Sequence, residues 1–242
     1  MKKLKILILL IQNPKMSVQL LKDWRKNRPH IYPAVINFNF HPATYLHSSR
    51  RSQYFDNLLP DRVWESPRVS GKISHHILKE LDLLDHGFLD YPDKRWPLIL
   101  LPTNRLQRLA FHIGAALLGP HIRNSLAREQ VIFWKEKLGQ EVYEFVLGSA
   151  RLLPYQLKNT EKIKNNNALS LGYEVILKSL DSAPKALRER VSLKIPIDQK
   201  IKSEIPTSAE HIVYSVMSIV EAEWRSLFLN LEVKNNLTAE IK

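Results

Sequence analysis

The residues with the best spacing for chemistry are histidines and carboxylates in residues 75–86. His75, Asp82 and His86 would share one stripe of a helix, at positions i, i+7 and i+11. Further candidate ligands lie beside them: His76, Glu80 and Asp85. Seven residues of helix rise by about 10 Å, which is too far for a single ion to bridge. The His-x3-His spacing of helical metal sites is also missing, so the pattern favours a solvated polar face.

The other histidines lack a partner for catalysis. His41 and His47 flank a Pro-Ala-Thr-Tyr-Leu turn, where His41 is expected to cap the turn. His112 falls within an apolar helical pattern, which is typical of a hydrogen-bonded interior histidine. A general base needs a nucleophile or proton donor within reach, and no such group is indicated near these positions. A run of aspartates straddles an expected helix end and loop, where solvation explains it: Asp82, Asp85, Asp90 and Asp93.

Phosphate-binding and hydrolase motifs are absent from the sequence. It has no GxGxxG, GxxxxGK[ST], GxSxG or HExxH pattern, only 7 glycines and no cysteine. Gly114 and Gly148 lie inside expected helices, where glycine costs about 1 kcal/mol against alanine, and we expect both to permit close helix packing. The sequence therefore predicts a protein that is not an enzyme, with no catalytic, cofactor-binding or metal-binding residue.

The net charge of +12 raises the alternative of a nucleic-acid-binding protein. Most of the excess lies in residues 1–60, whose net charge is +8, whereas residues 61–154 and 155–242 each carry +2. A DNA-binding body should carry the excess itself, so this distribution favours a solvated basic lead segment. The first residues resemble a weak signal peptide, but Met16 could be the true initiator. Elsewhere no apolar stretch reaches the roughly 20 residues of a membrane span.

The central part of the chain has the periodicity of packed helices. Residues 103–117 place five apolar side chains on one face: Leu106, Leu109, Ala110, Ile113 and Leu117. A second helix is expected over residues 122–133. A third, ending at Pro154, should face inward through Val142, Tyr143, Val146, Leu147 and Ala150. We expect Leu109, Ile113, Leu117, Val142 and Val146 to be almost fully buried.

Two short segments alternate like strands. Residues 36–40 alternate Ile and Phe with Asn, and residues 191–197 alternate Val, Leu and Ile with polar residues or Pro. They could pair into a small sheet. The predicted fold class is therefore mainly α, a compact helical domain with at most one small two-stranded β element.

Four parts are expected along the chain. Residues 1–30 form a basic N-terminal extension that could be mobile, and residues 31–205 form the helical core. Residues 206–231 form a C-terminal helix packed on the core, and residues 232–242 form a tail. Thr207 and Glu210 have the spacing of a capping box for the C-terminal helix. Its apolar residues recur every three or four positions: Val213, Val216, Val220, Trp224, Leu227 and Leu231.

Three ordered segments resemble the SctK family of type III secretion adaptors (YscK and OrgA/MxiK type). The first is NFHPATYLH at residues 39–47. The second comprises LPTNRLQRLAFHIGAALLGPHIRNSL at 101–126 and LGQEVYEFVLGSARLLP at 138–154. The third, NNNALSLGYEVILKSLDSAPKALRERVSLKIPI, spans 165–197. The resemblance covers roughly residues 36–200, and residues 1–30 and 232–242 extend past it.

The resemblance implies a non-enzymatic cytoplasmic adaptor, peripheral to the inner membrane at the base of the secretion apparatus. Such an adaptor joins the cytoplasmic domain of an SctD-type inner-membrane ring protein to an SctQ-type pod protein, and through the platform reaches an SctL-type stator. It implies no cofactor, no specific nucleic acid and no membrane span.

Aromatic residues beside arginines are the candidate partner-binding residues. Trp96, between Arg95 and Pro97 in an acidic and aromatic loop, is the best candidate for an exposed anchor, and Trp24 with Arg25 forms a second patch. Trp134 and Trp224 are expected in the core because of their periodicity.

Overall fold

The protein is described by a computed structural model, which covers residues 14–55, 59–64, 66–89, 93–149, 167–197 and 208–228. Helices account for all the regular structure of these ranges, and no strand occurs in them. The expected fold class is therefore confirmed as mainly α. Two compact units divide the chain, one made of residues 1–101, 184–197 and 231–242 and the other of residues 102–183 and 198–230.

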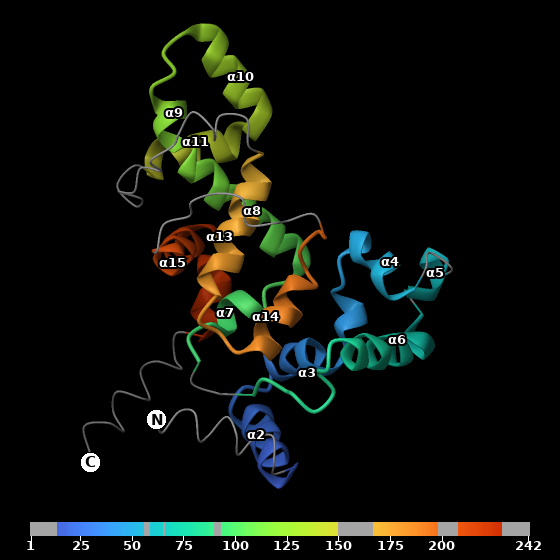
Figure 1. Ribbon diagram of the computed structural model, residues 1–242. Coiled ribbons are helices and arrows are strands. Elements are labelled where there is room, and N and C mark those ends of the chain that lie inside the picture. Colours follow the sequence, from blue (N-terminus) through green and yellow to red (C-terminus); the bar gives the residue numbers. More distant parts are fainter. Residues whose placement is uncertain are drawn as a thin grey trace, which may run out of the picture. The chain divides into compact units, whose positions relative to one another are not determined.

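Unit 1 is built from short helices. In chain order they are α2 (Pro14–Asn27), α3 (Tyr32–Phe40), η1 (Pro42–Thr44), η2 (Ser48–Arg50), α4 (Arg51–Tyr54), α5 (Asp61–Trp64), α6 (Pro67–Glu80), α7 (Trp96–Ile99) and α14 (Lys185–Ser192). Figure 1 shows α4 and α5 beside α6, and α6 also packs against η1. A segment from late in the chain, residues 184–197, thus completes the N-terminal unit.

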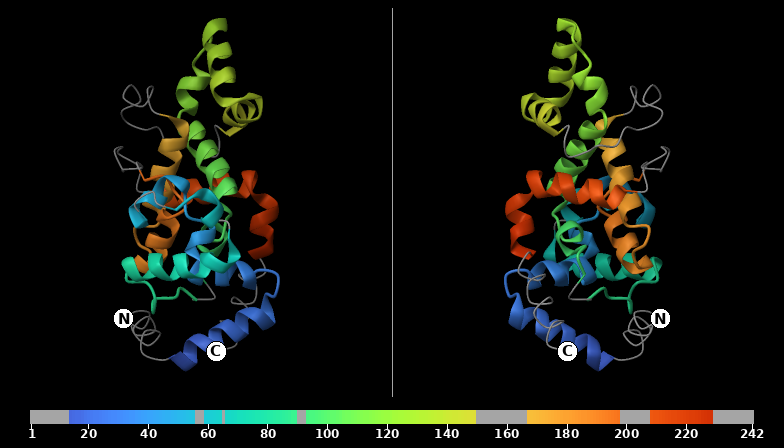
Figure 2. Two further views of the ribbon diagram at one scale, coloured as in Figure 1. Left: turned by 90° about the vertical axis from the view of Figure 1, so that its right-hand side faces the viewer. Right: turned by 90° about the vertical axis from the view of Figure 1, so that its left-hand side faces the viewer.

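Unit 2 is organised around two long helices. It contains α8 (Thr103–Leu117), α9 (Gly119–Arg123), α10 (Arg128–Leu138), α11 (Gln140–Gly148), α13 (Ala168–Ser179) and α15 (Ala209–Val220). The helices α8 and α13 lie side by side in every view (Figures 1 and 2), and α15 packs against both. The helices α10 and α11 form a hairpin, in which α11 contacts α8 and α9.

Glycine allows the close approach of α8 and α13. A Cβ added to Gly114 would lie 3.0 Å from the Cα of Ala168, and one added to Gly172 would lie 2.8 Å from the Cα of Ala110. The close-packing role expected for Gly114 is therefore confirmed. The same expectation is wrong for Gly148, because an added Cβ there would meet no atom within 4 Å.

The expected inward faces are largely correct. All five core residues named from periodicity are buried: Leu109, Ile113, Leu117, Val142 and Val146. Leu147 was also expected to face inward, but 44% of it is exposed, and Ala150 lies outside the described residues. The single helix expected over residues 122–133 is wrong, because α9 ends at Arg123 and a separate helix, α10, begins at Arg128 and continues to Leu138.

Both predicted strands are wrong. Residues 36–40 belong to α3, where Val35, Phe38 and Asn39 are buried at i, i+3 and i+4. Residues 191–197 continue from the end of α14 into turns, with Leu193, Lys194 and Ile195 all buried. In each segment one polar residue lies in the interior, Asn39 in the first and Lys194 in the second, so the alternation did not separate a buried face from a solvated one.

The C-terminal helix is interrupted. The helix α15 ends at Val220, and Glu221 leaves the helical region with φ −127° and ψ 35°. Thr207 and Leu231 lie outside the described residues. Trp224 is half-buried and Leu227 is 41% exposed, so the expected apolar seam does not continue as one buried stripe. The expected division at residues 30, 205 and 231 remains a prediction, although burial of Trp24 makes part of residues 1–30 belong to the core of unit 1.

Candidate functional site

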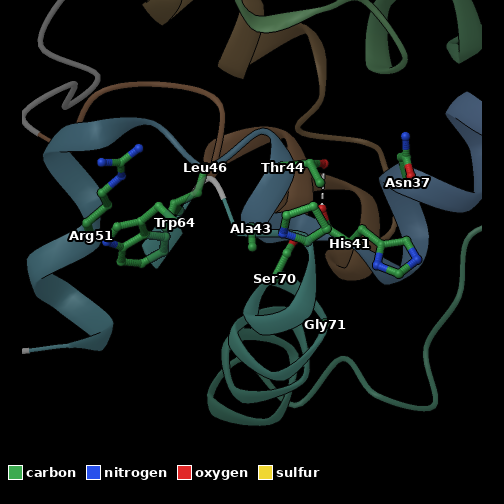
Figure 3. A pocket seen from close by; sticks show the side chains of 10 residues that line it. Asn37, His41, Ala43, Thr44, Leu46, Arg51, Trp64, Ser70 and Gly71 are labelled. Carbon is green, nitrogen blue, oxygen red and sulfur yellow. Dashed lines mark hydrogen bonds between the residues drawn. The ribbon is translucent and has the colours of Figure 1, made fainter. Parts of the chain in front are cut away.

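The candidate site is a groove in unit 1 with a cavity volume of about 680 Å³. The helices α3, α4, α5 and α6 and the turn η1 supply its lining. The lining residues are Asn37, His41, Ala43, Thr44, Leu46, Arg51, Trp64, Pro67, Ser70 and Gly71. In Figure 3, Arg51 and Trp64 stand at one end of the groove, and His41 and Asn37 stand at the other. The groove therefore has a cationic and aromatic end and a polar end.

Arg51 is held at its end of the groove by two contacts. Its guanidinium carbon lies 4.9 Å from the centre of the Trp64 ring. Its Nη1 atom donates to Asp61 Oδ1 at 2.6 Å. The Asp61 side chain is 89% exposed, so water screens this ion pair. Arg51 is consequently a partly exposed cation resting on an aromatic ring.

A small apolar cluster includes two of the lining residues and fixes their positions. Its buried members are Leu46, Trp64, Ile73, Ile77 and Leu193. The turn η1 is tied to α6 because the Ala43 amide donates to Ser74 Oγ at 3.2 Å. Trp64 also packs edge-on against Phe55, with ring centres 5.5 Å apart. The wall residues are therefore fixed by burial, which gives the groove a preformed shape.

The segments NFHPATYLH (residues 39–47) and SLKIP (residues 192–196), which are far apart in the sequence, meet beside this groove. The His47 amide donates to the Leu193 carbonyl at 2.8 Å. Arg50 Nε donates to the Ile195 carbonyl at 2.5 Å, and the Ile197 amide donates to Ser49 Oγ at 3.1 Å. The strand pairing expected between residues 36–40 and 191–197 is not what joins these parts of the chain, because the contacts here are made by the turns at residues 47–50.

A buried arginine joins α14 to the turns that follow α3 and α6. Arg190 of α14 is 1% exposed. Its guanidinium donates to four backbone carbonyls at 2.8–3.3 Å, those of Asn39, Leu83, His86 and Ala186. Burial lowers the pKa of Arg190. Since buried carbonyls need donors, this side chain stabilises the turns after α3 and α6.

Lys194 is a second buried cation. Its Nζ atom donates to the carbonyls of Ile99 and Leu101 at 2.6 and 2.9 Å. It also lies 5.5 Å from the Phe38 ring centre and 5.3 Å from that of Tyr45. Burial lowers the pKa of Lys194 to about 7. Residues within the segments that resemble the SctK family thus hold separate parts of the backbone together.

The structure places the tryptophans of the two expected partner-binding patches in the core. Trp24 and Trp96 are each 0% exposed, and their rings meet edge-on with centres 4.9 Å apart. Trp24 Nε1 donates to the Leu89 carbonyl at 3.3 Å. The expectation that Trp96 is an exposed anchor is therefore wrong, because Trp96 begins α7 and both Phe88 and Trp24 pack against its ring.

The two arginines of these patches remain accessible to different degrees. Arg25 is exposed on α2. Arg95 is half-buried, and its Nε donates to Asp93 Oδ1 at 2.7 Å. Partner binding through Trp96, Arg95, Trp24 and Arg25 stays a prediction, and among these residues Arg25 is the most accessible.

The histidines have structural surroundings. The expected stripe of His75, Asp82 and His86 is wrong, because α6 ends at Glu80 and Asp82 adopts a positive φ of 54°. In the ranges that the structure covers, no group of three His, Cys, Asp or Glu residues is arranged to hold a metal ion. His112 Nδ1 lies 2.8 Å from the Arg108 carbonyl, and burial lowers the pKa of His112. The interior role expected for His112 is confirmed.

Sequence reasoning missed an exposed apolar patch at the α10 hairpin of unit 2. Leu126 precedes α10 and is 89% exposed, while Ile132 and Phe133 within α10 are 43% and 53% exposed. Trp134 on the same helix is buried as expected. The available signal was the uninterrupted Val-Ile-Phe-Trp run, which places apolar residues on more than one side of a helix.

Comparison with known proteins gives one match. The family model for YOP proteins translocation protein K (YscK) matches residues 34–231. No curated protein and no solved structure matches. Among the helices that the structure describes, none has the length and apolar character required to cross a membrane.

The matched region contains all three signature segments and most of both compact units. It also includes the groove, the buried cations and the crossing of α8 with α13. The chain therefore belongs to the YscK family and is a type III secretion protein.

Proposed function

We propose that this protein is a non-enzymatic adaptor of the type III secretion sorting platform, which joins the SctD-type inner-membrane ring protein to the SctQ-type pod protein. The observation that carries the proposal is the family match over residues 34–231, which agrees with the ordered resemblance of the three segments. In this role the protein acts in the cytoplasm, at the inner-membrane base of the apparatus, and reaches an SctL-type stator through the platform.

The division into two compact units supports a bridging role. Each unit has its own buried residues, with Trp96 and Arg190 in unit 1 and Leu109 and Val146 in unit 2. Each also carries a distinct accessible feature, the groove in unit 1 and the exposed apolar residues of the α10 hairpin in unit 2. A protein that binds two partners needs two such surfaces, and a separate core behind each one keeps its shape independent of the other.

The mechanism of an adaptor is binding at two sites held by one chain. Once one partner has bound, the linked second site meets its own partner at an increased effective concentration. In this way the protein can promote assembly without forming or breaking a covalent bond. The chain's contribution is the shape and charge of its surfaces.

A deletion strain tests this function. We expect loss of the protein to abolish type III secretion and to remove the pods beneath the apparatus, while the membrane rings remain. Secreted effectors can be measured in culture supernatants, and pods can be observed by cryo-electron tomography. Continued secretion with intact pods would refute the adaptor role. Co-purification of the full-length chain with both partners is the biochemical counterpart.

A further inference from the structure

We propose that the groove of unit 1 binds an acidic segment of a partner protein, with a carboxylate paired to Arg51 and an apolar side chain packed against Trp64 and Leu46. This inference rests on the adaptor function proposed above and names the chemistry of one of its two binding sites. It is carried by three features of the groove, namely its charge, its open floor and its preformed wall.

The charge of the lining favours a negatively charged ligand. Among the ten lining residues, Arg51 is the permanent cation, and none is Asp or Glu. Pro67, Ser70 and Gly71 belong to the first turns of α6, a helix of 14 residues with no acidic residue in its first turn. The positive end of the helix dipole therefore adds to the charge of Arg51. A carboxylate in the groove would be attracted both by Arg51 and by the N-terminus of α6.

Arg51 can change partners at small cost. Its present ion pair is with Asp61, whose side chain is 89% exposed, and exposed pairs of this kind contribute little to stability because water screens them. Its Nε atom is buried and forms no hydrogen bond within the described part of the chain. A rotation toward an incoming carboxylate would give that donor an acceptor and allow the paired hydrogen bonds that guanidinium groups form with carboxylates.

The floor of the groove has room for a side chain. A Cβ added to Gly71 would meet nothing within 4 Å, and Gly71 is exposed on α6. Figure 3 shows Ala43, Ser70 and Gly71 between the two ends, so the middle of the groove is formed by small residues. Leu46 and Trp64 supply the apolar part of the lining, where each exposes a small part of its surface, 8% and 7% respectively. The groove thus offers a charged contact beside an apolar one, the combination that binds an acidic segment with an apolar anchor.

Two variants test the groove without altering the core. Gly71→Leu places a side chain in the open floor, and Arg51→Gln removes the cation. Their matched controls are Gly148→Leu, at a helical glycine that also has no atom within 4 Å of an added Cβ, and Arg68→Gln, which removes a charge from α6 outside the lining. Far-UV circular dichroism and the thermal midpoint should show that all four variants fold.

The binding assay is calorimetric titration of the full-length chain with two probes, the purified pod protein and the cytoplasmic domain of the ring protein. We expect both groove variants to weaken binding of one probe by at least about tenfold, the loss expected for one charge-assisted contact, while the controls stay within about twofold. Binding of that probe should also weaken between about 0.05 and about 0.5 M salt, and Arg51→Gln should reduce this dependence.

The possible failures are distinguishable. If the wild-type chain binds both probes and the groove variants bind as their controls do, the groove proposal is wrong and the adaptor function stands. If the wild-type chain binds neither probe, both proposals are wrong.

A third arm of the experiment uses vesicles of anionic phospholipid. Retention on vesicles that is lost in Arg51→Gln, with protein binding unchanged, would show that the groove serves a lipid headgroup and would overturn the proposal.

Discussion

Replacing a single hydrogen at the crossing of α8 and α13 should measurably destabilise the protein. In Gly114→Ala the new methyl group would lie 3.0 Å from the Cα of Ala168 and closer still to its carbonyl group. Ordinary contacts of a Cβ atom begin at 3.4 Å. Because the opposing atoms are backbone, no side chain can rotate away, and the two helices must separate or tilt.

The expected magnitude follows from two opposing effects. Glycine to alanine in a helix interior normally stabilises by about 1 kcal/mol. Overpacking against a fixed neighbour costs about 1–3 kcal/mol or more, and separation also opens gaps among side chains packed at the crossing. Since the clash here involves main-chain atoms, we expect the cost of overpacking to exceed the gain from replacing a glycine in a helix. With backbone atoms opposing the methyl group the cost should lie at the upper end, about 3 kcal/mol, and less the gain of about 1 kcal/mol the predicted net loss for Gly114→Ala is about 2 kcal/mol of unfolding free energy.

The measurement is urea unfolding followed by far-UV circular dichroism, with Gly71→Ala as the matched control. Gly71 also lies inside a helix, but its added Cβ would meet nothing within 4 Å, so this variant should gain stability. Gly172→Ala, on the other side of the crossing, should resemble Gly114→Ala. The double variant should lose less than the sum of the two single losses, because helices already separated by one methyl group accommodate the second more easily. A Gly114→Ala protein as stable as Gly71→Ala would refute the close-packing argument.

Three further outcomes are expected from unfolding measurements. Leu117→Ala should cost about 2–5 kcal/mol by leaving a cavity, whereas Leu147→Ala, at a residue 44% exposed, should cost much less; equal losses would contradict the assigned core. Trp24→Ala should cost about 3–5 kcal/mol because its indole is fully buried, and a neutral effect would mean that α2 does not stabilise unit 1. Unfolding free energy should rise by about 2 kcal/mol between pH 7 and pH 9, because the pKa of Lys194 is lowered to about 7 and the unfolded chain binds the extra proton in that window. Lys194→Met should abolish this rise and Lys185→Met, at an exposed lysine, should keep it.

The central helices could be predicted because their periodicity matches a single buried face. Leu109, Ile113 and Leu117 recur at the spacing of a helix that packs on one side, and each is at most 2% exposed. Gly114 was identifiable for the same reason, since a glycine within such a face has few roles other than close approach. Gly148 looked equivalent in sequence but lies at the end of α11. Local pattern cannot show whether another helix crosses at a given glycine.

Buried polar side chains explain the wrong strand predictions. Alternation indicates a strand only when the polar positions face solvent. Asn39 breaks this condition, since its side chain binds the Val35 and Phe88 carbonyls and accepts from the Phe88 amide. Lys194 breaks it in the second segment, with its Nζ bound to two carbonyls. Phe88, Ile99 and Leu101 lie far from these side chains in the sequence, so composition alone could not reveal the contacts.

The groove could not be predicted from the sequence for a similar reason. Its two ends come from separate elements, Trp64 from α5 and His41 from the turn before η1, and they face one cavity only because α6 packs against both α5 and η1. Trp96 shows the opposite error. It was favoured as an anchor because arginine and proline flank it, but Phe38, Phe88 and Trp24 surround its ring. An aromatic residue in an expected loop can equally be what holds that loop to the core.

The signature segments and the partner-binding surface must therefore be sought in different residues. In NFHPATYLH and SLKIP, the side chains of Asn39 and Lys194 bond to backbone carbonyls inside unit 1. A substitution there leaves buried groups without partners and acts on folding before it can act on recognition. Such residues therefore act in the folding of unit 1. We expect partner choice to depend instead on accessible groups whose replacement leaves the core intact, such as Arg51 in the groove and Phe133 on α10. Variants that abolish secretion while leaving unfolding free energy unchanged should map to the second kind of residue, and a concentration of them in the buried signature positions would contradict this separation.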